Sequence, residues 1–174
     1  MDQRQKPAFL DHRYAGRVTS RIAGFLAHIG LQTAPAALPQ DTFLSGLTIS
    51  QGTLLIDEPK LTYPGDVLHE AGHLAVTPPE RRALLHHNAG GDPGEEMMAI
   101  AWSYAAALHV GIDPAVVFHG GGYQGGGKAI VDNFSQGKYF GVPMLEWLGL
   151  TADKQKATLL NVPPYPHMLK WLRE

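Results

Sequence analysis

The chain has 174 residues, which is long enough to bury a hydrophobic core. Hydrophobic residues make up 44% of it and charged residues 17%, which excludes an intrinsically disordered protein and is compatible with a homo-oligomer. The formal net charge of -2 leaves no basic excess to attract nucleic acid or an anionic membrane, so we expect neither as a partner. The chain has no cysteine, so any metal ion would have to be held by histidine and carboxylate side chains.

The N-terminal third predicts one amphipathic helix followed by a β-hairpin. Apolar residues recur every three or four positions in His12–Ile29, and Gly30 follows as a stop signal. Residues 32–40 are rich in proline and alanine, which predicts a connector. Two short β-prone runs, Gly46–Ser50 and Thr53–Asp57, are joined by a two-residue turn, which is typical of a hairpin.

The middle of the chain predicts two longer helices between clear stop signals. Residues 64–66 form a turn with Asp66 as the N-cap, and Val67–Val76 then continues helically until Pro78 and Pro79 end it. The next segments are predicted as a short helix, a glycine-rich loop and a long apolar helix: Glu80–His87, Asn88–Gly94 and about Glu95–Val110.

The C-terminal third predicts short helices around a glycine-rich segment. Asp113 and Pro114 suit the start of a short helical segment that reaches Phe118. The segment Gly120–Gly127 consists mostly of glycine, a composition that predicts no regular element. Further helices and one linker are expected: helices at Ala129–Gln136, Pro143–Leu148 and Pro166–Arg173, and the linker at Thr151–Pro164.

Together these patterns predict a mostly helical α+β fold and a single domain over residues 1–174. Residues 1–16 are polar and lack the apolar run of a secretory signal. The longest apolar segment, Met97–Val110, is too short to span a bilayer. We therefore expect a cytoplasmic protein.

The segment from His69 to His73 has the pattern H-E-x-x-H on a predicted helix. Residues four positions apart lie one above the other on a helix, so the imidazoles of His69 and His73 can hold one metal ion. Glu70 lies about 100° further around the helix axis, where it misses the metal but reaches a metal-bound water. The metal would lower the pKa of that water, and Glu70 would take its proton as the general base.

A catalytic zinc site needs a third protein ligand and an open position. Glu95 and Glu96 are the candidates, because they begin the next long helix after His73. Acidic residues are also favoured at helix N-termini by the helix dipole, but small residues on both helices permit the close approach that a shared metal site requires. The residues alone leave the choice between the two glutamates open.

The surroundings of the pentad are similar to those of a known family. The residues that carry this similarity are His69, Glu70, His73, Glu96-Met97-Met98-Ala99 and the predicted hairpin Gly46–Asp57. The chain resembles the zincin metallopeptidases of the gluzincin type, and more narrowly the small ImmA/IrrE-like members, over about residues 10–110. It departs from that family at Met97 and Met98, which stand where the family commonly has a polar residue, and in lacking a Leu-Leu-Met-Pro ending of the second helix.

This resemblance implies a minimal zincin-like fold, in which a short hairpin packs on the pentad helix and a ligand-bearing helix follows. It implies one Zn²⁺ per chain, held by His69, His73 and Glu96, with Glu95 as the alternative third ligand. The implied function is that of a zinc-dependent hydrolase, a metallopeptidase in which Glu70 activates a zinc-bound water to cleave a peptide or protein substrate. Residues 111–174 would be a helical and glycine-rich C-terminal extension that the family does not match.

Other interpretations stay open beside this one. The alternative function is a metal-stabilised binding or regulatory module with a zincin fold and little or no catalysis. Residues 122–129 spell G-x-x-x-x-G-K-A, close to a phosphate-binding loop, but alanine replaces the hydroxyl residue that would hold magnesium. We expect instead a flexible loop near a cleft, on which Tyr123 or His119 could donate a hydrogen bond to an oxyanion. His86 and His87 predict a solvated helix end.

Overall fold

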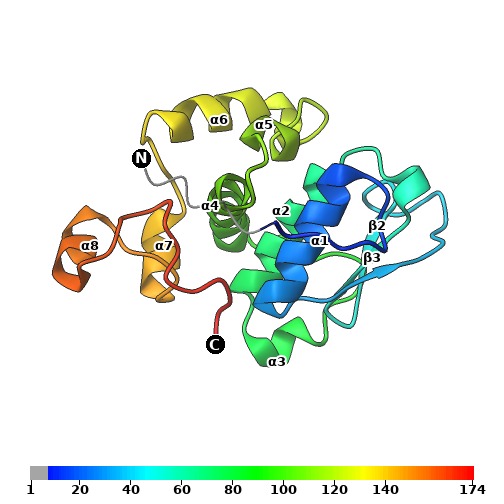
Figure 1. Ribbon diagram of the computed structural model, residues 1–174, viewed down its shortest axis with the longest axis horizontal. Coiled ribbons are helices and arrows are strands. Elements are labelled where there is room, and N and C mark those ends of the chain that lie inside the picture. The colour runs from blue at the N-terminus through cyan, green and yellow to red at the C-terminus, as the bar shows by residue number, and fades with distance from the viewer. Residues whose placement is uncertain (1–7) are drawn as a thin grey trace.

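Helix α4 (Pro93–Val110) runs through the centre of the structure, a computed structural model that describes residues 8–174 (Figure 1). The side chain of Asp92 caps this helix by accepting a hydrogen bond from the backbone N–H of Glu95. Gly111 ends it in a left-handed conformation. The helix therefore begins slightly earlier than its apolar pattern predicts, and both glutamates lie in its first turn.

Helices α1 (Arg17–Ile29) and α2 (Gly65–Val76) pack beside α4 and beside each other. The contact between α2 and α4 is very close, because a Cβ added at Gly72 would lie 2.8 Å from the carbonyl oxygen of Ala99. Only a glycine permits this approach without a shift of one helix. The small residues expected to bring the two helices together therefore do so.

A small three-stranded sheet packs against α1 and α2. Its strands β1 (Thr33–Pro35), β2 (Leu47–Ser50) and β3 (Thr53–Ile56) lie in the order β1-β3-β2, with β1 parallel and β2 antiparallel to β3. The hairpin β2–β3 confirms the prediction, whereas β1 lies inside the segment predicted as a connector. A three-residue strand carries no periodic signal of its own, and Pro35 is tolerated because β1 is an edge strand.

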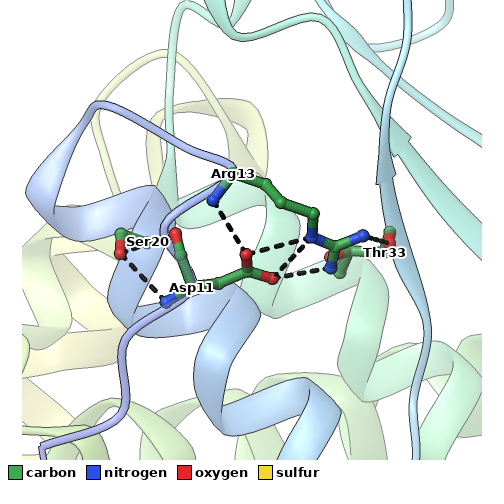
Figure 2. A network of polar contacts seen from close by, with 4 residues as sticks. All are labelled: Asp11, Arg13, Ser20 and Thr33. Atoms are coloured by element: carbon green, nitrogen blue, oxygen red, sulfur yellow. Dashed lines mark hydrogen bonds and ion pairs between the residues drawn. The ribbon is translucent and has the colours of Figure 1, made fainter.

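A polar network ties the segment before α1 to the sheet (Figure 2). The guanidinium of Arg13 binds the carboxylate of Asp11 and donates a hydrogen bond of 2.9 Å to the backbone oxygen of Thr33 in β1. Ser20 Oγ donates to the backbone oxygen of Asp11 and accepts from its N–H. These contacts hold residues 11–13 in a turn, so α1 begins at Arg17 rather than at His12.

The remaining helices are short. In Figure 1, α5 and α6 lie along one side of α4, while α7 and α8 lie at the end of the molecule opposite the sheet. Two 3₁₀ turns precede longer helices: η1 (Glu58–Lys60) lies before α2, and η2 (Tyr123–Gly125) lies before α6. The short α-helices are α3 (Pro79–Arg82), α5 (Pro114–Val117), α6 (Gly127–Ser135), α7 (Val142–Trp147) and α8 (Lys154–Leu160). The mostly helical α+β fold that the sequence predicts is confirmed.

Several predicted boundaries were wrong. The helix expected to reach His87 ends at Arg82, because the following residues turn toward the edge of β2. The linker expected at Thr151–Pro164 contains α8, whose N-terminus is capped by Asp153. The helix expected at Pro166–Arg173 is absent from the described chain. Backbone groups of Trp171 and Arg173 instead form hydrogen bonds with α4 and α2.

This C-terminal segment closes the end of α2. The backbone N–H of Arg173 donates to the carbonyl oxygen of Ala75, and the Arg82 guanidinium donates to the carbonyls of Leu74 and Arg173. Trp102 Nε1 in α4 donates to the backbone oxygen of Trp171 at 2.9 Å. The bonds to Leu74 and Ala75 satisfy carbonyls that the end of α2 leaves without an intrahelical partner, and the other two tie the non-helical C-terminal segment to Arg82 and α4.

The buried apolar core is one contiguous cluster that includes residues from Phe9 to Met168. Its largest fully buried side chain is Trp102, on α4. Among the described residues, no helix has the length and apolar character needed to cross a bilayer.

Candidate metal centre

Helix α2 presents His69 and His73 side by side, as the spacing predicts. Their Nε2 atoms are 3.2 Å apart, and the planes of the two rings are nearly perpendicular, at 89°. Ligand atoms from His69, Glu70 and His73 all lie within 4.8 Å of one another. Among the described residues this is the one group of three or more such side chains that meets this distance limit, and it does not include Glu96.

Glu96 on α4 faces the same point from the other side. Its Oε2 lies 2.9 Å from His73 Nε2, and its Oε1 lies 3.5 Å from His69 Nε2. Glu95 points elsewhere and forms an ion pair with Arg81. Successive residues on a helix point in directions about 100° apart, which explains why adjacent glutamates have different partners.

The separations between these three side chains suit a tetrahedral metal ion. Zinc binds imidazole nitrogen and carboxylate oxygen at about 2.0–2.2 Å, so two ligand atoms on one tetrahedral ion lie about 3.3 Å apart. The three contacts among His69, His73 and Glu96 measure 2.9, 3.2 and 3.5 Å. These separations are close to that spacing, with the two Glu96 contacts made by different carboxylate oxygens, so the side chains fit a zinc ion.

The cluster is strongly coupled in its electrostatics. Hydrogen bonds to His69 and His73 hold the pKa of Glu96 well below its usual range. Burial is the largest single effect and would lower the pKa of His73, but the hydrogen bond to Glu96 and the charges of Glu70, Glu96 and Glu95 together raise that pKa. The Nδ1 atoms of both histidines are buried and have no hydrogen-bond partner among the described residues, so their polar interactions concentrate at Nε2.

Glu70 differs from Glu96 in its surroundings. Only 7% of Glu70 is exposed, and burial raises its pKa above that of an ordinary carboxyl, although the two histidines oppose the shift. A carboxyl group with a raised pKa is suited to accept and return a proton near neutral pH.

A cavity of about 500 Å³ opens above the cluster. The residues that line it include His69, Glu70, His73 and Glu96, and also the apolar Phe43 and Leu44. Two loops complete the wall: residues 88–91, which precede α4, and residues 122–123 of the glycine-rich segment. The cleft that the sequence leaves unplaced is therefore located, and the glycine-rich segment borders it.

A second polar group ties that glycine-rich segment to α2. His119 Nε2 lies 2.7 Å from Asp66 Oδ1, and the N–H of Gly121 donates to His119 Nδ1. Because Nδ1 accepts this bond, Nε2 carries the proton and donates it to Asp66. The ring of Tyr63 stacks on His119 with 3.6 Å between centroids. Asp66, predicted as the N-cap, instead lies in the first turn of α2, which begins at Gly65.

Tyr123 lies beside the candidate metal centre. Its ring meets His69 edge to face at 5.3 Å, and its hydroxyl is buried with no hydrogen-bond partner among the described residues. Its backbone and that of Gln124 are left-handed, with φ of 55° and 53°. This conformation is uncommon for residues other than glycine, and such residues gather at functional sites. The sequence offers Tyr123 and His119 as equivalent candidates, and the structure places only Tyr123 against the cluster.

The other predicted candidates have structural explanations. Residues 86–87 are exposed and belong to no metal-binding group in the described part of the chain. Lys128 pairs with Asp132, one turn further along α6, and the element before this glycine-rich segment is the helix α5 rather than a strand. This context does not match a phosphate-binding loop, which follows a strand.

Comparison of the chain with models of known families, with curated proteins and with solved structures gives no match. What the site does must therefore be inferred from its own geometry. That geometry comprises two imidazoles and a carboxylate around one point, a buried carboxyl beside them and an open cavity above.

Proposed function

We propose that the protein is a zinc-dependent hydrolase, a metallopeptidase of the gluzincin type. The observation that carries this proposal is the meeting of His69 Nε2, His73 Nε2 and the Glu96 carboxylate at spacings that one tetrahedral ion would give. Three protein ligands with a fourth position left open are typical of catalytic rather than structural zinc sites. The cavity above the three side chains supplies the space for that fourth position.

The bound zinc would supply a Lewis acid that polarises the substrate carbonyl and makes water acidic enough to react. Glu70 accepts a proton from the attacking water and returns it to the amine nitrogen as the carbon–nitrogen bond breaks, so its carboxylate is regenerated. Its burial supports this role, because a raised pKa balances taking up and giving away a proton.

The walls of the cavity favour a peptide as the substrate. Tyr123 offers a buried hydroxyl that has no partner in residues 8–174 and can donate a hydrogen bond to the oxygen of the scissile carbonyl. Phe43, 75% exposed, and Leu44 offer an apolar surface for a side chain of the substrate. We propose a peptide or protein substrate, without nucleic acid or membrane partners.

Metal analysis tests the site and one substitution tests the chemistry. The purified chain is expected to hold about one zinc ion, which His73→Ala should lose. Glu70→Gln should keep the zinc and slow the cleavage of an unstructured peptide library by about 10²–10⁴-fold. A wild-type chain that stays free of zinc after reloading would refute the site, and a fully active Glu70→Gln variant would refute the mechanism.

A specific observation also supports the alternative, a metal-stabilised binding or regulatory module. Because Glu96 belongs to α4 and the histidines belong to α2, a bound ion would cross-link the two central helices. In that case zinc should raise the melting temperature of the chain while no peptide in the library is cleaved in a Glu70-dependent way.

A further inference from the structure

The segment Leu85–Gly91, here called the strap, connects α3 to the cap of α4 and lies along the free edge of the sheet. His86 forms an antiparallel bridge with Ser50 of β2. The N–H of His87 donates to the carbonyl oxygen of Ile49 at 2.7 Å, and Thr48 Oγ1 donates to the carbonyl oxygen of His87 at 3.3 Å. The strap thus occupies backbone groups that β2 would otherwise offer to another strand.

The strap also separates β2 from the candidate metal centre. Its residues 88–91 form part of the cavity wall, whereas no residue of β2, all of which are described, borders the cavity. An extended peptide commonly binds by adding a strand to an exposed sheet edge, where main-chain hydrogen bonds hold it. Here the edge nearest the cavity already has such an occupant from the same chain.

We propose that the strap is an autoinhibitory segment that must leave β2 before an extended peptide pairs with this edge and reaches His69 and His73. This inference rests on the proposed function, because it concerns how a peptide enters that site. It adds a closed and an open state, which differ in whether Ile49 O accepts from His87 or from the substrate backbone.

The strap has the features of a segment that can move. His87 adopts a left-handed conformation with φ of 67°, which is unfavourable for a residue with a side chain. A Cβ added at Gly90 or Gly91 would meet no described atom within 4 Å, so no neighbouring atoms crowd the backbone of the strap next to α4. Within the strap only Ala89 is buried, and His86 and His87 are exposed.

A reversible disulfide tests the proposal. The hydrogen bonds of this strand pair flank Ser50 and His86 rather than joining them, as in a non-hydrogen-bonded pair, whose Cα atoms lie about 4.5 Å apart. That distance suits a disulfide.

The natural chain has no cysteine, so Ser50→Cys/His86→Cys forms one bond without competitors. In the zinc-loaded chain, oxidation should lower kcat/KM for an unstructured fluorogenic peptide library by about tenfold or more, and reductant should restore it. The two single variants, treated with the same oxidant, are the controls.

A binding experiment separates this proposal from the proposed function. The double-cysteine chain is combined with Glu70→Gln, and the binding of the same peptides is followed by fluorescence anisotropy in the reduced and oxidised forms. Weaker binding after oxidation supports the strap even if no form of the protein cleaves peptides, an outcome that would refute only the hydrolase. Equal binding or equal cleavage in the two forms would show that the strap is a permanent fourth strand, which overturns the inference. A reduced form that binds none of the peptides would also overturn it.

Discussion

Two histidine–carboxylate pairs lie at the cavity, which His73, Glu96 and Asp66 line and His119 does not, and they differ in what the rest of each histidine contacts. His73 lies 2.9 Å from Glu96, and His119 lies 2.7 Å from Asp66. Both ring nitrogens of His119 have partners, and Tyr63 covers one face of its ring. In contrast, Nε2 of His73 shares its carboxylate with a second imidazole, and its Nδ1 has no partner among the described residues.

This difference separates a site that can bind from a contact that holds structure. At His73, three ligand atoms converge with an open cavity beside them, so a cation would add favourable interactions. At His119, every polar atom of the ring is already used, and the contact joins the glycine-rich segment to α2. The distance between a histidine and a carboxylate is thus a poor guide to function unless the remaining polar atoms are also counted.

The largest effect on metal binding is expected from replacing one of the two adjacent glutamates on α4. Glu96→Gln should lower zinc affinity by at least about a hundredfold, because it removes a charged ligand. Glu95→Gln is the matched control: it removes the same charge one residue away, breaks the pair with Arg81 and should leave zinc affinity unchanged. Competition with a chelator measures both constants, and equal losses in the two variants would contradict the assignment of Glu96.

A smaller effect on catalysis is expected at Tyr123. Tyr123→Phe removes only the buried hydroxyl, so kcat should fall by about 10²-fold while zinc stays bound. Steady-state kinetics on the peptide library, together with zinc content, measure this change. An unchanged kcat would show that the hydroxyl does not contact the reacting carbonyl.

At the pair of His119 and Asp66, the expected effect is on stability alone. His119→Ala leaves the Asp66 carboxylate without its donor and should lower the free energy of unfolding by about 1–3 kcal/mol, with zinc binding retained. His12→Ala, at an exposed position, serves as the control. Denaturant unfolding gives the free energies, and loss of zinc from His119→Ala would place this pair with the metal centre after all.

The smallest expected effect is a pH dependence of the stability, which arises from the contacts of Asp57 next to the sheet. Asp57 Oδ2 accepts a hydrogen bond from the N–H of Leu38 and pairs with Lys60, which together hold the pKa of Asp57 below its ordinary value. Stabilisation by a carboxyl with a lowered pKa is present above the unfolded-state pKa and is lost as the pH falls through the folded-state pKa. The wild type should therefore be more stable than Asp57→Asn at neutral pH, and the difference should shrink in acid. A difference that is constant from neutral to acidic pH would rule out this carboxylate as its source.

The parts of the fold that follow from local pattern could be predicted from the sequence. The spacing of His69 and His73 on one helix, the hairpin β2–β3 and the apolar helix before Val110 all depend on residues close together in the chain. These elements also position the candidate metal centre, which is why its location could be expected.

Contacts between distant residues could not be predicted in the same way. Strand β1 is extended because it pairs with β3. The first residues of the strap were predicted as helix, but they form backbone hydrogen bonds with β2 instead. The bond from His119 to Asp66 joins residues 53 positions apart, and no spacing rule indicates it. Which of the two adjacent glutamates faces His69 and His73 depends on the rotation of α4, which its packing against other helices fixes. The single domain over residues 1–174 stays a prediction.

The glycine at position 72 has a consequence beyond packing. A methyl group there would meet Ala99 of α4 at less than ordinary contact distance, so the absence of a side chain sets how far α2 stands from α4. That spacing is also the width across which His73 and Glu96 face each other. If a metal ion binds between the two helices as proposed, their separation limits the ionic radius that fits, and Gly72→Ala should shift the preference toward larger cations while the candidate ligands stay the same.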